Sequence, residues 1–446
     1  MFGNRRRVAA TMLLWAAAPA TAQLAPPHVQ TTAEALAQDA AAYATLHPVP
    51  LDEAERRLLA QEESVATTDR IARTYAARLA GVAIEHEPAY RIVVLLTGDD
   101  PVPDEVVAAG GLAVPVHYAT GARATRDEIV RAIERNQATI RAMLAHPPGL
   151  GLDQRTGELV VTLNGSDVSP YRDEAALRDR LAELTGVPVS LRLLDGVDAN
   201  AASVEGGARV VGLNPADGRR YACTTGFTVT DGARDGVVTA AHCPDELSLV
   251  APGEPPAPLS FAGQWGWGYQ DVQLHLADRP LEPLFYADTP KTQARAVERA
   301  RPRASTRAGD MVCHRGERTG YSCAEVALTD FAPAGDLCGG ACLPTWVAVK
   351  GPTCRSGDSG APVFLGDTAF GLVKGGTYAP DRRCLFYYYM STDYLPEGWR
   401  LLQAADRLPA SRQPTATIPP AAAPQPSRNA PAPSAPLNAG GAGAPG

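Results

Sequence analysis

The sequence predicts an all-β domain in the second half of the chain, preceded by a smaller α/β region. From about Ala208 onward helical periodicity fades, and short runs such as residues 226–230 and 345–349 alternate like half-buried strands. Short, regularly spaced strands separated by turn residues are typical of a β-barrel or β-sandwich. All eight cysteines lie between Cys223 and Cys384, so we expect a disulfide framework in the same half.

The first half of the chain predicts a mixture of helices and strands. Thr125 and Glu128 form a capping-box pattern at the start of one helix. The apolar face of that helix would carry Ile129, Ile133, Ile140 and Leu144. Other helices are expected within residues 32–80 and at 172–184, the latter stopping near Gly186, and strands at 90–96, 158–163 and 187–194. No motif with evident chemistry occurs in this α/β region.

Both ends of the chain predict segments that lie outside the folded domains. Residues 5–7 are three arginines, residues 8–20 are mostly apolar, and Ala20-Thr21-Ala22 fits a signal-peptidase site before Gln23. The apolar stretch is shorter than the about 20 residues that span a bilayer, so we favour an exported protein with a signal peptide at 1–22 over a membrane anchor. Residues 408–446 are Pro/Ala-rich and predict a disordered tail.

Composition excludes several classes of partner. The 446 residues carry a net charge of -8, and no Lys/Arg-rich run is long enough to follow a phosphate backbone. We therefore expect no nucleic-acid partner. No segment approaches the run of about 20 apolar residues that spans a bilayer, so we also expect no membrane partner. An even number of cysteines in an exported chain indicates disulfides. Cys338 and Cys342 do not form a CxxC pair and have no histidine cluster around them, so we expect no metal and no cofactor.

A candidate nucleophile lies in the stretch Gly357-Asp358-Ser359-Gly360, although these residue types also suit an ordinary polar turn. A serine hydroxyl attacks well only when a neighbouring base takes its proton, and that base needs an acid to orient it. The β-rich half contains three histidines. His242 ends an apolar stretch and is the best candidate base. His314 is expected on a surface hairpin, and His275 is expected to be a solvated or hydrogen-bonded sheet residue.

The candidate acid is Asp271, which precedes the alternating run VQLHL. A carboxylate at the mouth of a buried strand can be held in place and partly removed from water. Asp245, Asp278 and Asp310 are alternatives, but each lies in a polar turn context.

Three stretches in this order resemble the chymotrypsin-type serine peptidases: TAAHC at 239–243, VCHRGERTGYSC at 312–323 and GDSGAPVF at 357–364. The second is similar to the bacterial secreted branch, the alpha-lytic and streptogrisin endopeptidases. The resemblance covers about residues 206–402. It implies a chymotrypsin-like double β-barrel of six strands each, with the active site in the cleft between the barrels.

The resemblance also implies roles for individual residues. Ser359 would attack the scissile carbonyl, His242 would act as general base and then acid, and Asp271 would orient His242. The backbone amides of Gly357 and Ser359 would form the oxyanion hole. The carboxylate of Asp358 would be buried against a new amino terminus or a substitute for it. The implied disulfides are Cys223–Cys243, Cys313–Cys323, Cys338–Cys342 and Cys354–Cys384.

The pocket wall does not carry over from the resemblance, because the spacing from Cys354 to Ser359 is one residue shorter than in the streptogrisin pattern. We expect the substrate pocket to be lined by Arg355, Ser356, Lys374, Gly375, Gly376 and Thr377. No carboxylate is placed to bind a basic side chain, so a small or apolar preference is expected, or an acidic one if Arg355 or Lys374 faces inward. Lys374 stands where the family normally has serine. Its ammonium could pair with Asp271 and weaken the hold of that residue on His242, or it could turn outward to water.

The resemblance finally implies that residues 23–204 form a pro-region that assists folding and then inhibits, and that residues 205–407 form the peptidase. We expect the mature chain to begin between residues 199 and 208 and to be a monomer. The predicted function is a secreted serine endopeptidase, extracellular or periplasmic, made as a zymogen and acting on protein or peptide substrates. The alternatives are a binding or regulatory protein on a peptidase scaffold, and a passive adhesion or matrix protein.

Overall fold

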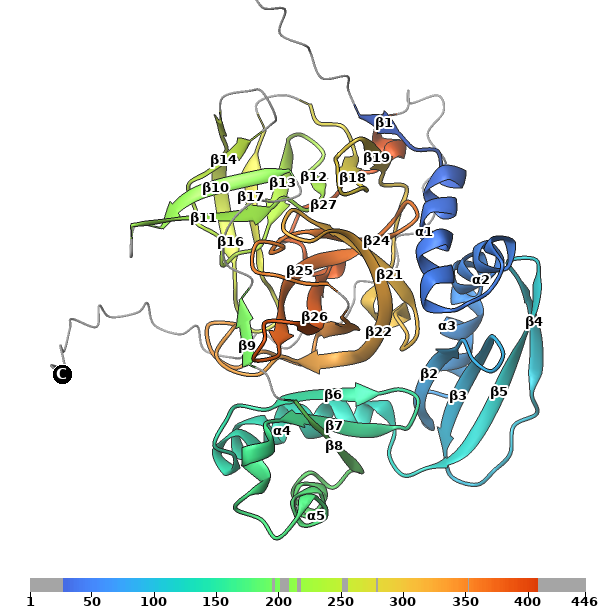
Figure 1. Ribbon diagram of the computed structural model, residues 1–446. Coiled ribbons are helices and arrows are strands. Elements are labelled where there is room, and N and C mark those ends of the chain that lie inside the picture. The colour runs from blue at the N-terminus through green and yellow to red at the C-terminus, as the bar shows by residue number, and fades with distance from the viewer. Residues whose placement is uncertain are drawn as a thin grey trace, which may run out of the picture.

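The computed structural model describes residues 27–194, 208–214, 218–250, 256–277, 280–351 and 353–407, together with the backbone of 197–200. The predicted signal peptide, the disordered tail, Asp278 and most of the predicted maturation segment lie outside the described residues. We call residues 27–194 the amino-terminal region and residues 208–407 the barrel region. The described chain is mostly β-structure, with its longer helices confined to the amino-terminal region (Figure 1).

Six strands of the barrel region close into a barrel in the order β21, β24, β25, β26, β23, β22, and β22 pairs back onto β21. Their bounds are β21 Met311–Gly316, β22 Gly320–Ala332, β23 Trp346–Lys350, β24 Pro362–Leu365, β25 Thr368–Tyr378 and β26 Cys384–Ser391. Trp346, Val347, Ala348 and Val349 are all buried. The expectation of a half-buried strand at 345–349 is therefore wrong, because both faces of β23 are covered.

The other half of the barrel region consists of two sheets. One has the order β16-β17-β13-β12-β27 and the other the order β11-β10-β14-β15. Their bounds are β10 Arg209–Asn214, β11 Arg219–Thr224, β12 Thr228–Thr230, β13 Asp235–Thr239, β14 Leu247–Val250, β15 Ala257–Pro258, β16 Ser260–Trp265, β17 Val272–Leu276 and β27 Arg400–Leu401. Among the described residues these sheets do not pair with each other, so one closed barrel is present where the resemblance implies two.

Short elements complete the barrel region and join it to β1, the first strand of the amino-terminal region. A three-stranded sheet joins β1 to β19 and β18, and β20 pairs with β25. The bounds are β1 His28–Val29, β18 Leu284–Tyr286, β19 Gln293–Ala296, β20 Arg299–Ala300, and the 3-10 turns η2 Arg303–Ser305, η3 Thr392–Tyr394 and η4 Ala404–Arg407.

The amino-terminal region is built from two α/β units. The first packs helices α1 Thr32–Leu46, α2 Leu51–Glu63 and α3 Val65–Thr74 with strands β2 Leu79–Glu85, β3 Arg91–Thr97, β4 Glu105–Ala109 and β5 Leu112–Ala122. The second contains α4 Arg126–Met143, β6 Gly149–Asp153, β7 Glu158–Leu163, η1 Gly165–Val168, α5 Glu174–Thr185 and β8 Val189–Leu193. The α/β character predicted for this half of the chain is confirmed.

Local sequence explains the helix ends of the amino-terminal region. The Thr125 hydroxyl accepts a hydrogen bond from the backbone amide of Glu128, and the Glu128 carboxylate accepts one from the amide of Thr125. This capping box satisfies amide groups that have no partner within the helix. At the other end of the second unit, α5 stops at Gly186, whose φ of +72° is readily adopted by glycine. Both predicted signals are confirmed.

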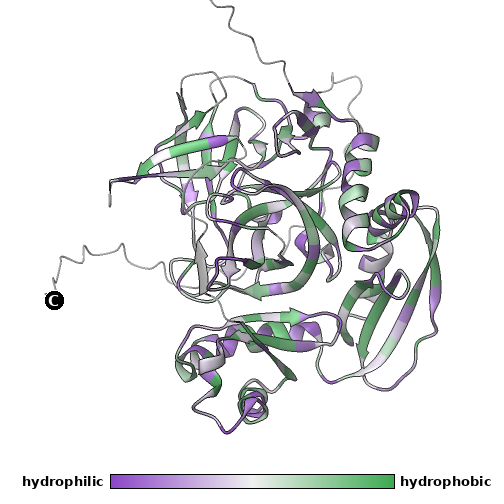
Figure 2. Cartoon of the chain, in the orientation of Figure 1, coloured by the Kyte–Doolittle hydropathy of each residue, from purple (hydrophilic) through white to green (hydrophobic). Residues whose placement is uncertain are grey.

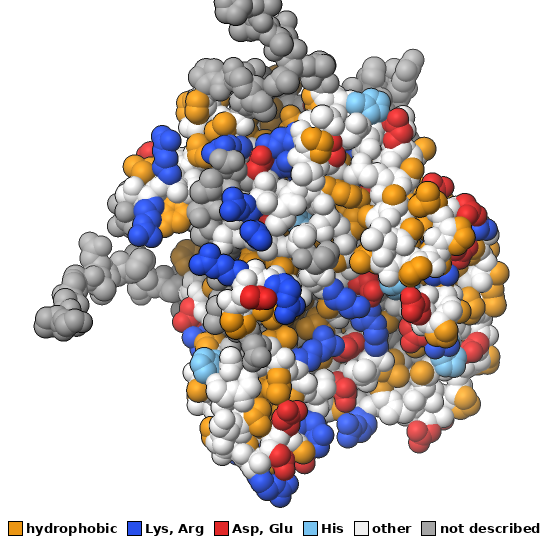
Figure 3. Space-filling model, in the orientation of Figure 1, with side chains coloured by type: hydrophobic (Ala, Val, Ile, Leu, Met, Phe, Trp, Pro, Cys, Tyr) orange, Lys and Arg blue, Asp and Glu red, His pale blue; other side chains and the backbone are white. Residues whose placement is uncertain are grey.

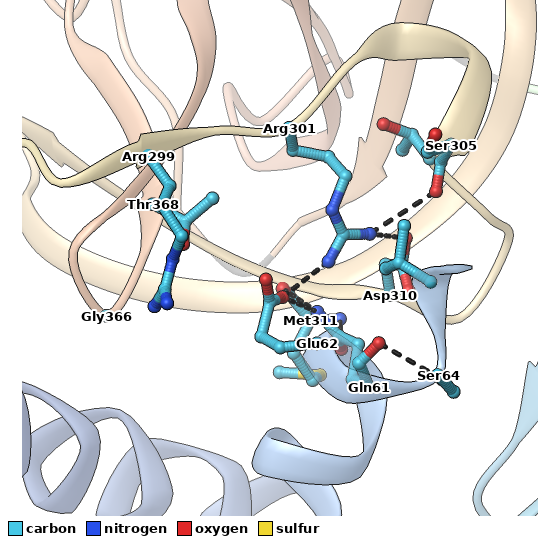
Figure 4. Close-up of polar contacts among 12 residues, drawn as sticks. Gln61, Glu62, Ser64, Arg299, Arg301, Ser305, Asp310, Met311, Gly366 and Thr368 are labelled. Atoms are coloured by element: carbon cyan, nitrogen blue, oxygen red, sulfur yellow. Dashed lines mark hydrogen bonds and ion pairs between the residues drawn. The ribbon is translucent and has the colours of Figure 1, made fainter. Parts of the chain in front are cut away.

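The two regions are joined by β-strand pairing and by buried ion pairs. β6 pairs with β22, so the barrel sheet continues into β7 and β8. Figure 1 shows β6–β8 beneath the barrel and α1–α3 beside it. In Figure 4 the Arg301 guanidinium lies between Asp310 of its own region and Glu62 of α2, at 3.2 and 2.5 Å. Asp39 and Arg295, both buried, form a second ion pair across the junction at 2.9 Å.

Hydrophobic residues concentrate on the strands of the barrel and of the amino-terminal sheet, whereas polar residues recur along the outer helices (Figure 2). On the face shown in Figure 3, acidic and basic side chains are interspersed. Within the described part of the chain, none of the helices has the length and apolar character needed to cross a membrane.

Candidate active site

The structure brings Ser359, His242 and Asp271 together. Strand β13 leads to His242, Asp271 immediately precedes β17, and these two strands pair antiparallel with Thr239 opposite Gln273. The end of one strand therefore meets the start of the other. His242 Nδ1 lies 2.8 Å from Asp271 Oδ2, and His242 Nε2 lies 2.8 Å from Ser359 Oγ.

Asp271 is buried and accepts two kinds of hydrogen bond from His242. Besides the ring contact, the backbone amide of His242 donates to Asp271 Oδ1 at 3.2 Å. Burial by itself would raise the pKa of Asp271, but the charges of His242 and Lys374, with the hydrogen bonds from them, outweigh burial and lower the pKa to about 2. Asp271 is therefore ionised at neutral pH and is positioned to hold the Nδ1–H tautomer of His242.

Lys374 lies behind this acid. Its ammonium is 3.3 Å from Asp271 Oδ2 and 5.1 Å from the centroid of the Trp346 ring, and the side chain is 1% exposed. Burial lowers the pKa of Lys374, and the charge of Asp271 opposes that shift. Of the two orientations considered from the sequence, the outward one is wrong. Because its ammonium faces the acid, Lys374 is also not available as a charged pocket residue.

The remaining predicted pocket residues fall into two groups. Gly375, Gly376 and Thr377 lie on β25, and Arg355 and Ser356 are exposed in the loop before Ser359. The backbone of β9, Val197–Asn200, pairs antiparallel with this part of β25 and places Asn200 opposite Gly375. Since Gly375 follows Lys374, the end of β9 at Asn200 lies beside the segment of β25 that carries Lys374.

The loop that carries Ser359 is fixed by glycines and backbone hydrogen bonds. Gly357 and Gly360 have φ values of +110° and +83°, which side-chain-bearing residues rarely adopt. A Cβ at Gly360 would also collide with the Thr224 carbonyl. The carbonyl of Ser359 accepts from the amide of Thr224 at 2.8 Å, and the amide of Gly360 donates to the Val373 carbonyl at 2.7 Å. The oxyanion-hole role of the Gly357 and Ser359 amides stays a prediction.

The carboxylate of Asp358 also fixes the loop that carries Ser359. This carboxylate, fully buried, accepts from the backbone amides of Arg318 and Thr319 at 3.1 Å, from that of Arg355 at 2.9 Å, and from the Thr319 hydroxyl at 2.9 Å. The turn between β21 and β22 thus holds this carboxylate through amide groups rather than a chain terminus. Sequence reasoning did not single out Arg318 and Thr319, because a backbone donor leaves no residue-type signal.

Four disulfides are present, and they are the pairs that the resemblance implies: Cys223–Cys243, Cys313–Cys323, Cys338–Cys342 and Cys354–Cys384. The first joins β11 to the residue after His242. The last joins the loop of Ser359 to β26. Both therefore brace segments that carry the candidate catalytic side chains.

The other candidates from the sequence lie away from Ser359. His314 is buried and contacts the Thr319 hydroxyl at 3.2 Å, so its expected position on a surface hairpin is wrong. His275 is also buried, and in the described part of the chain neither ring nitrogen has a hydrogen-bond partner. Asp310 pairs with Arg301 and Arg307, and Asp245 accepts from Gln264.

No family model matches the chain, and no curated protein matches it. Similar solved structures include Protease A of Thermobifida fusca, Nocardiopsis protease and Cellulomonas bogoriensis chymotrypsin. Their sequence identities are 20, 20 and 21%, and their TM-scores are 0.36, 0.35 and 0.34. The matches cover 46, 45 and 45% of this chain and 100, 99 and 100% of the other chains. At these values the similarities do not decide the function of this protein.

Proposed function

We propose that the protein is a secreted serine endopeptidase that hydrolyses peptide bonds through an acyl-enzyme on Ser359. The observation that carries the proposal is the continuous hydrogen-bonded chain from Asp271 through His242 to Ser359, with contacts of 2.8 Å at both steps. Base and nucleophile within hydrogen-bond reach, with the base oriented by a third group, are what serine activation requires.

The chemistry follows from these contacts. His242 Nε2 takes the proton of Ser359 Oγ as that oxygen attacks the carbonyl carbon of the substrate. The resulting oxyanion would be bound by the amides of Gly357 and Ser359. His242 then gives the proton to the leaving amine, the carbon–nitrogen bond breaks, and an acyl-enzyme remains. A water molecule, deprotonated by the same nitrogen, attacks the acyl carbon. The bond from that carbon to Ser359 Oγ breaks, His242 returns the proton to Oγ, and the carboxylic acid leaves.

We further propose that residues 23–204 are a pro-region that assists folding and inhibits the enzyme in cis. Two observations support the inhibitory part. The backbone of β9 occupies the edge of β25 beside Lys374, where a substrate strand would add by β-pairing. In addition, β6 extends the barrel sheet from outside. Cleavage between residues 199 and 208 would free the edge of β25. The product would be a monomeric enzyme whose folded part ends at about residue 407 and is followed by the predicted tail.

The residues near the site support a preference for small or apolar side chains. Gly375 and Gly376 bring no side chain and no charge to this part of β25, and Lys374 pairs with Asp271 rather than with a substrate. Arg355 is exposed and remains the one pocket candidate that could attract an acidic side chain.

A fluorophosphonate probe tests the proposed function, because it reacts with activated serines. The secreted protein is treated with the probe and its peptides are analysed by mass spectrometry, beside His242→Ala and Ser359→Ala chains. We expect labelling at Ser359 in the parent, none in Ser359→Ala, and a large loss in His242→Ala. Equal labelling in the parent and in His242→Ala would show that His242 does not activate the serine.

The second candidate function is a binding or regulatory protein on a peptidase scaffold. The contact between Lys374 and Asp271 is the observation that favours it, because the ammonium competes with His242 for the same carboxylate oxygen. A secreted chain that loses its amino-terminal region but never reacts with the probe would establish this candidate instead.

A further inference from the structure

A cluster of two histidines and a glutamate lies at the junction of the two regions, outside the candidate active site. His47 follows α1, His86 follows β2, and Glu325 lies on β22 of the barrel. One ligand atom from each residue can be chosen so that all lie within 4.8 Å of one another. His47 and His86 are 8 and 7% exposed, and their rings stack at 4.4 Å.

His86 has one donor and one acceptor nitrogen, and its partners show which is which. Its Nε2 lies 2.8 Å from the Gly309 carbonyl, which can only accept, so Nε2 carries the hydrogen. Nδ1 is then the acceptor, and the Tyr43 hydroxyl donates to it at 2.9 Å, so an ion bound through Nδ1 would replace this hydrogen bond. Metal-binding histidines usually donate their second ring nitrogen to a carbonyl or carboxylate in this way. His86 therefore has the tautomer and the support that a ligand through Nδ1 requires.

His47 has ring nitrogens that are not satisfied by the surrounding protein. Neither has a hydrogen-bond partner in the described part of the chain, although Nε2 lies 3.3 Å from Glu325 Oε1. The contact has the distance of an ion pair but not the alignment of a hydrogen bond. Two ligands on a tetrahedral zinc ion, each bound at about 2.0–2.1 Å, are separated by about 3.3 Å. The spacing of these two atoms fits a shared metal.

Glu325 divides its two oxygens between different partners. Oε2 accepts from Lys350 at 2.8 Å and lies 3.5 Å from Arg155, whereas Oε1 faces His47. The two cations fix the carboxylate and reduce its charge without occupying Oε1. Ligating carboxylates are commonly hydrogen-bonded on their outer side in this manner.

We propose that His47, His86 and Glu325 bind a divalent transition-metal ion, with Zn²⁺ as the ion of choice, and that the ion bridges the amino-terminal region to the barrel. Two imidazoles and one carboxylate form a ligand set that suits zinc, with solvent in the fourth position. The sequence did not predict the site, because its ligands are separated by 39 and 239 positions and no local spacing connects them. Loss of the amino-terminal region would remove both imidazoles, so the ion would favour the covered form of the barrel.

Zinc binding is measured on the full chain carrying Ser359→Ala, so that the result does not depend on the proposed catalysis. The protein is freed of metal with EDTA, dialysed, and titrated with Zn²⁺ by calorimetry and with Co²⁺ by visible absorption. We expect one equivalent of each ion and the absorption of a four-coordinate Co²⁺ site. His47→Gln and Glu325→Gln should each weaken binding by at least about tenfold.

His117→Ala is the matched control, because His117 is a histidine of the same region paired with Asp104 at 2.9 Å but 44% exposed at the surface. It should bind zinc as the parent does. Thermal unfolding of each metal-free variant checks that it folds. No binding by the folded parent, or equal affinity in the parent and both folded ligand variants, would overturn the proposal.

Hydrogen exchange tests whether the ion bridges the two regions. With Zn²⁺ we expect slower amide exchange both around His47 and in β22 near Glu325, and no such slowing in the Glu325→Gln chain. Slower exchange around His47 alone would show that Glu325 is not a ligand and would overturn the bridging role.

Discussion

The barrel region and the amino-terminal region are held together by different means. The barrel region contains one barrel that closes through β21 and β22, and it carries four disulfides. Residues 1–222 contain no cysteine. The contacts that fasten the amino-terminal region to the barrel region include ion pairs with buried carboxylates, such as Asp39 with Arg295 and Asp330 with Arg126. The barrel region is thus cross-linked by disulfides, whereas the described contacts of the amino-terminal region with it are non-covalent. Because the amino-terminal region is proposed to cover the active site until it is removed, we call residues 27–194 the cover below.

This difference suits a precursor. A region that must leave after folding cannot be cross-linked to the part that stays, but it must be specific enough to place one strand on β25. Buried ion pairs supply that specificity, since a buried charge without its partner is strongly unfavourable. The following predictions test the contrast between a permanent site and a removable cover, from the largest effect to the smallest.

The largest effect is expected for substitutions of the candidate catalytic residues in the barrel region. Ser359→Ala or His242→Ala should lower kcat for peptide hydrolysis by about 10⁶-fold, and Asp271→Asn by about 10⁴-fold, because the three groups act as one unit. The measurement is steady-state hydrolysis of a peptide substrate by the matured chain. Full activity in any one of these variants would mean that another group performs that step.

The next effect concerns the buried attachment of the cover. Asp39 accepts from Arg295 at 2.9 and 3.0 Å and from the Tyr321 hydroxyl at 2.6 Å. In the Ser359→Ala chain, Asp39→Asn should destabilise the junction by about 3–5 kcal/mol, because Arg295 loses its buried counter-charge. Urea unfolding measures the loss.

Asp336→Asn is the matched control for Asp39→Asn. Asp336 pairs with Arg141 across the same junction at 2.6 Å, but it is 66% exposed. An exposed pair contributes about 0–1 kcal/mol, so this variant should unfold nearly as the parent does. Equal losses in the two variants would show that burial does not distinguish these attachments.

Acid should loosen the cover through Asp330. Burial would raise the pKa of Asp330, but Arg126 of the amino-terminal region and Arg303 of the barrel region outweigh burial and lower it far below its ordinary value. A carboxylate with a lowered pKa adds stability that is complete above its unfolded pKa of about 3.9 and is lost as the pH falls. The urea midpoint of Ser359→Ala should therefore fall between pH 6 and pH 3.

Arg126→Met sharpens the test of Asp330. This variant removes the charge that reaches Asp330 from the cover and leaves Arg303 in place. Its midpoint should be lower than that of the parent at pH 6 and should change less between pH 6 and pH 3. An unchanged pH dependence would assign the acid effect to other carboxylates.

The smallest effect is expected for Lys374→Ser. Loss of the ammonium removes a competitor for Asp271 and a positive charge near His242, so turnover should rise by up to about tenfold. The acid limb of the pH–kcat/KM profile should move to higher pH, because the carboxylate of Asp271 loses the positive charge that competes with His242 for it.

Lys374→Met is the control for the Lys374→Ser variant, because it removes the charge while keeping most of the volume beside Trp346. It should move the acid limb in the same direction as Lys374→Ser. An acid limb that stays in place in both variants would mean that the charge of Lys374 does not act on the triad.

The features that could be predicted from the sequence are those that depend on neighbouring residues. The capping box at Thr125 and the stop at Gly186 depend on neighbouring residues, and the structure contains both. The placement of His242 and Asp271 together depends on strand pairing, and it was anticipated through the resemblance rather than from spacing. The buried position of His314 and the inward turn of Lys374 depend on which side chains cover them, and no local pattern in the sequence carries that information.

The most direct test of the account is the rate of fluorophosphonate reaction in the two forms of the secreted protein, followed by intact mass spectrometry. A chain that begins between residues 199 and 208 should react at Ser359, and the full precursor, in which β9 occupies β25, should react far more slowly. Equal rates in the two forms would contradict the inhibitory cover. A matured chain that does not react would contradict the central claim that Ser359, His242 and Asp271 form a working catalytic site.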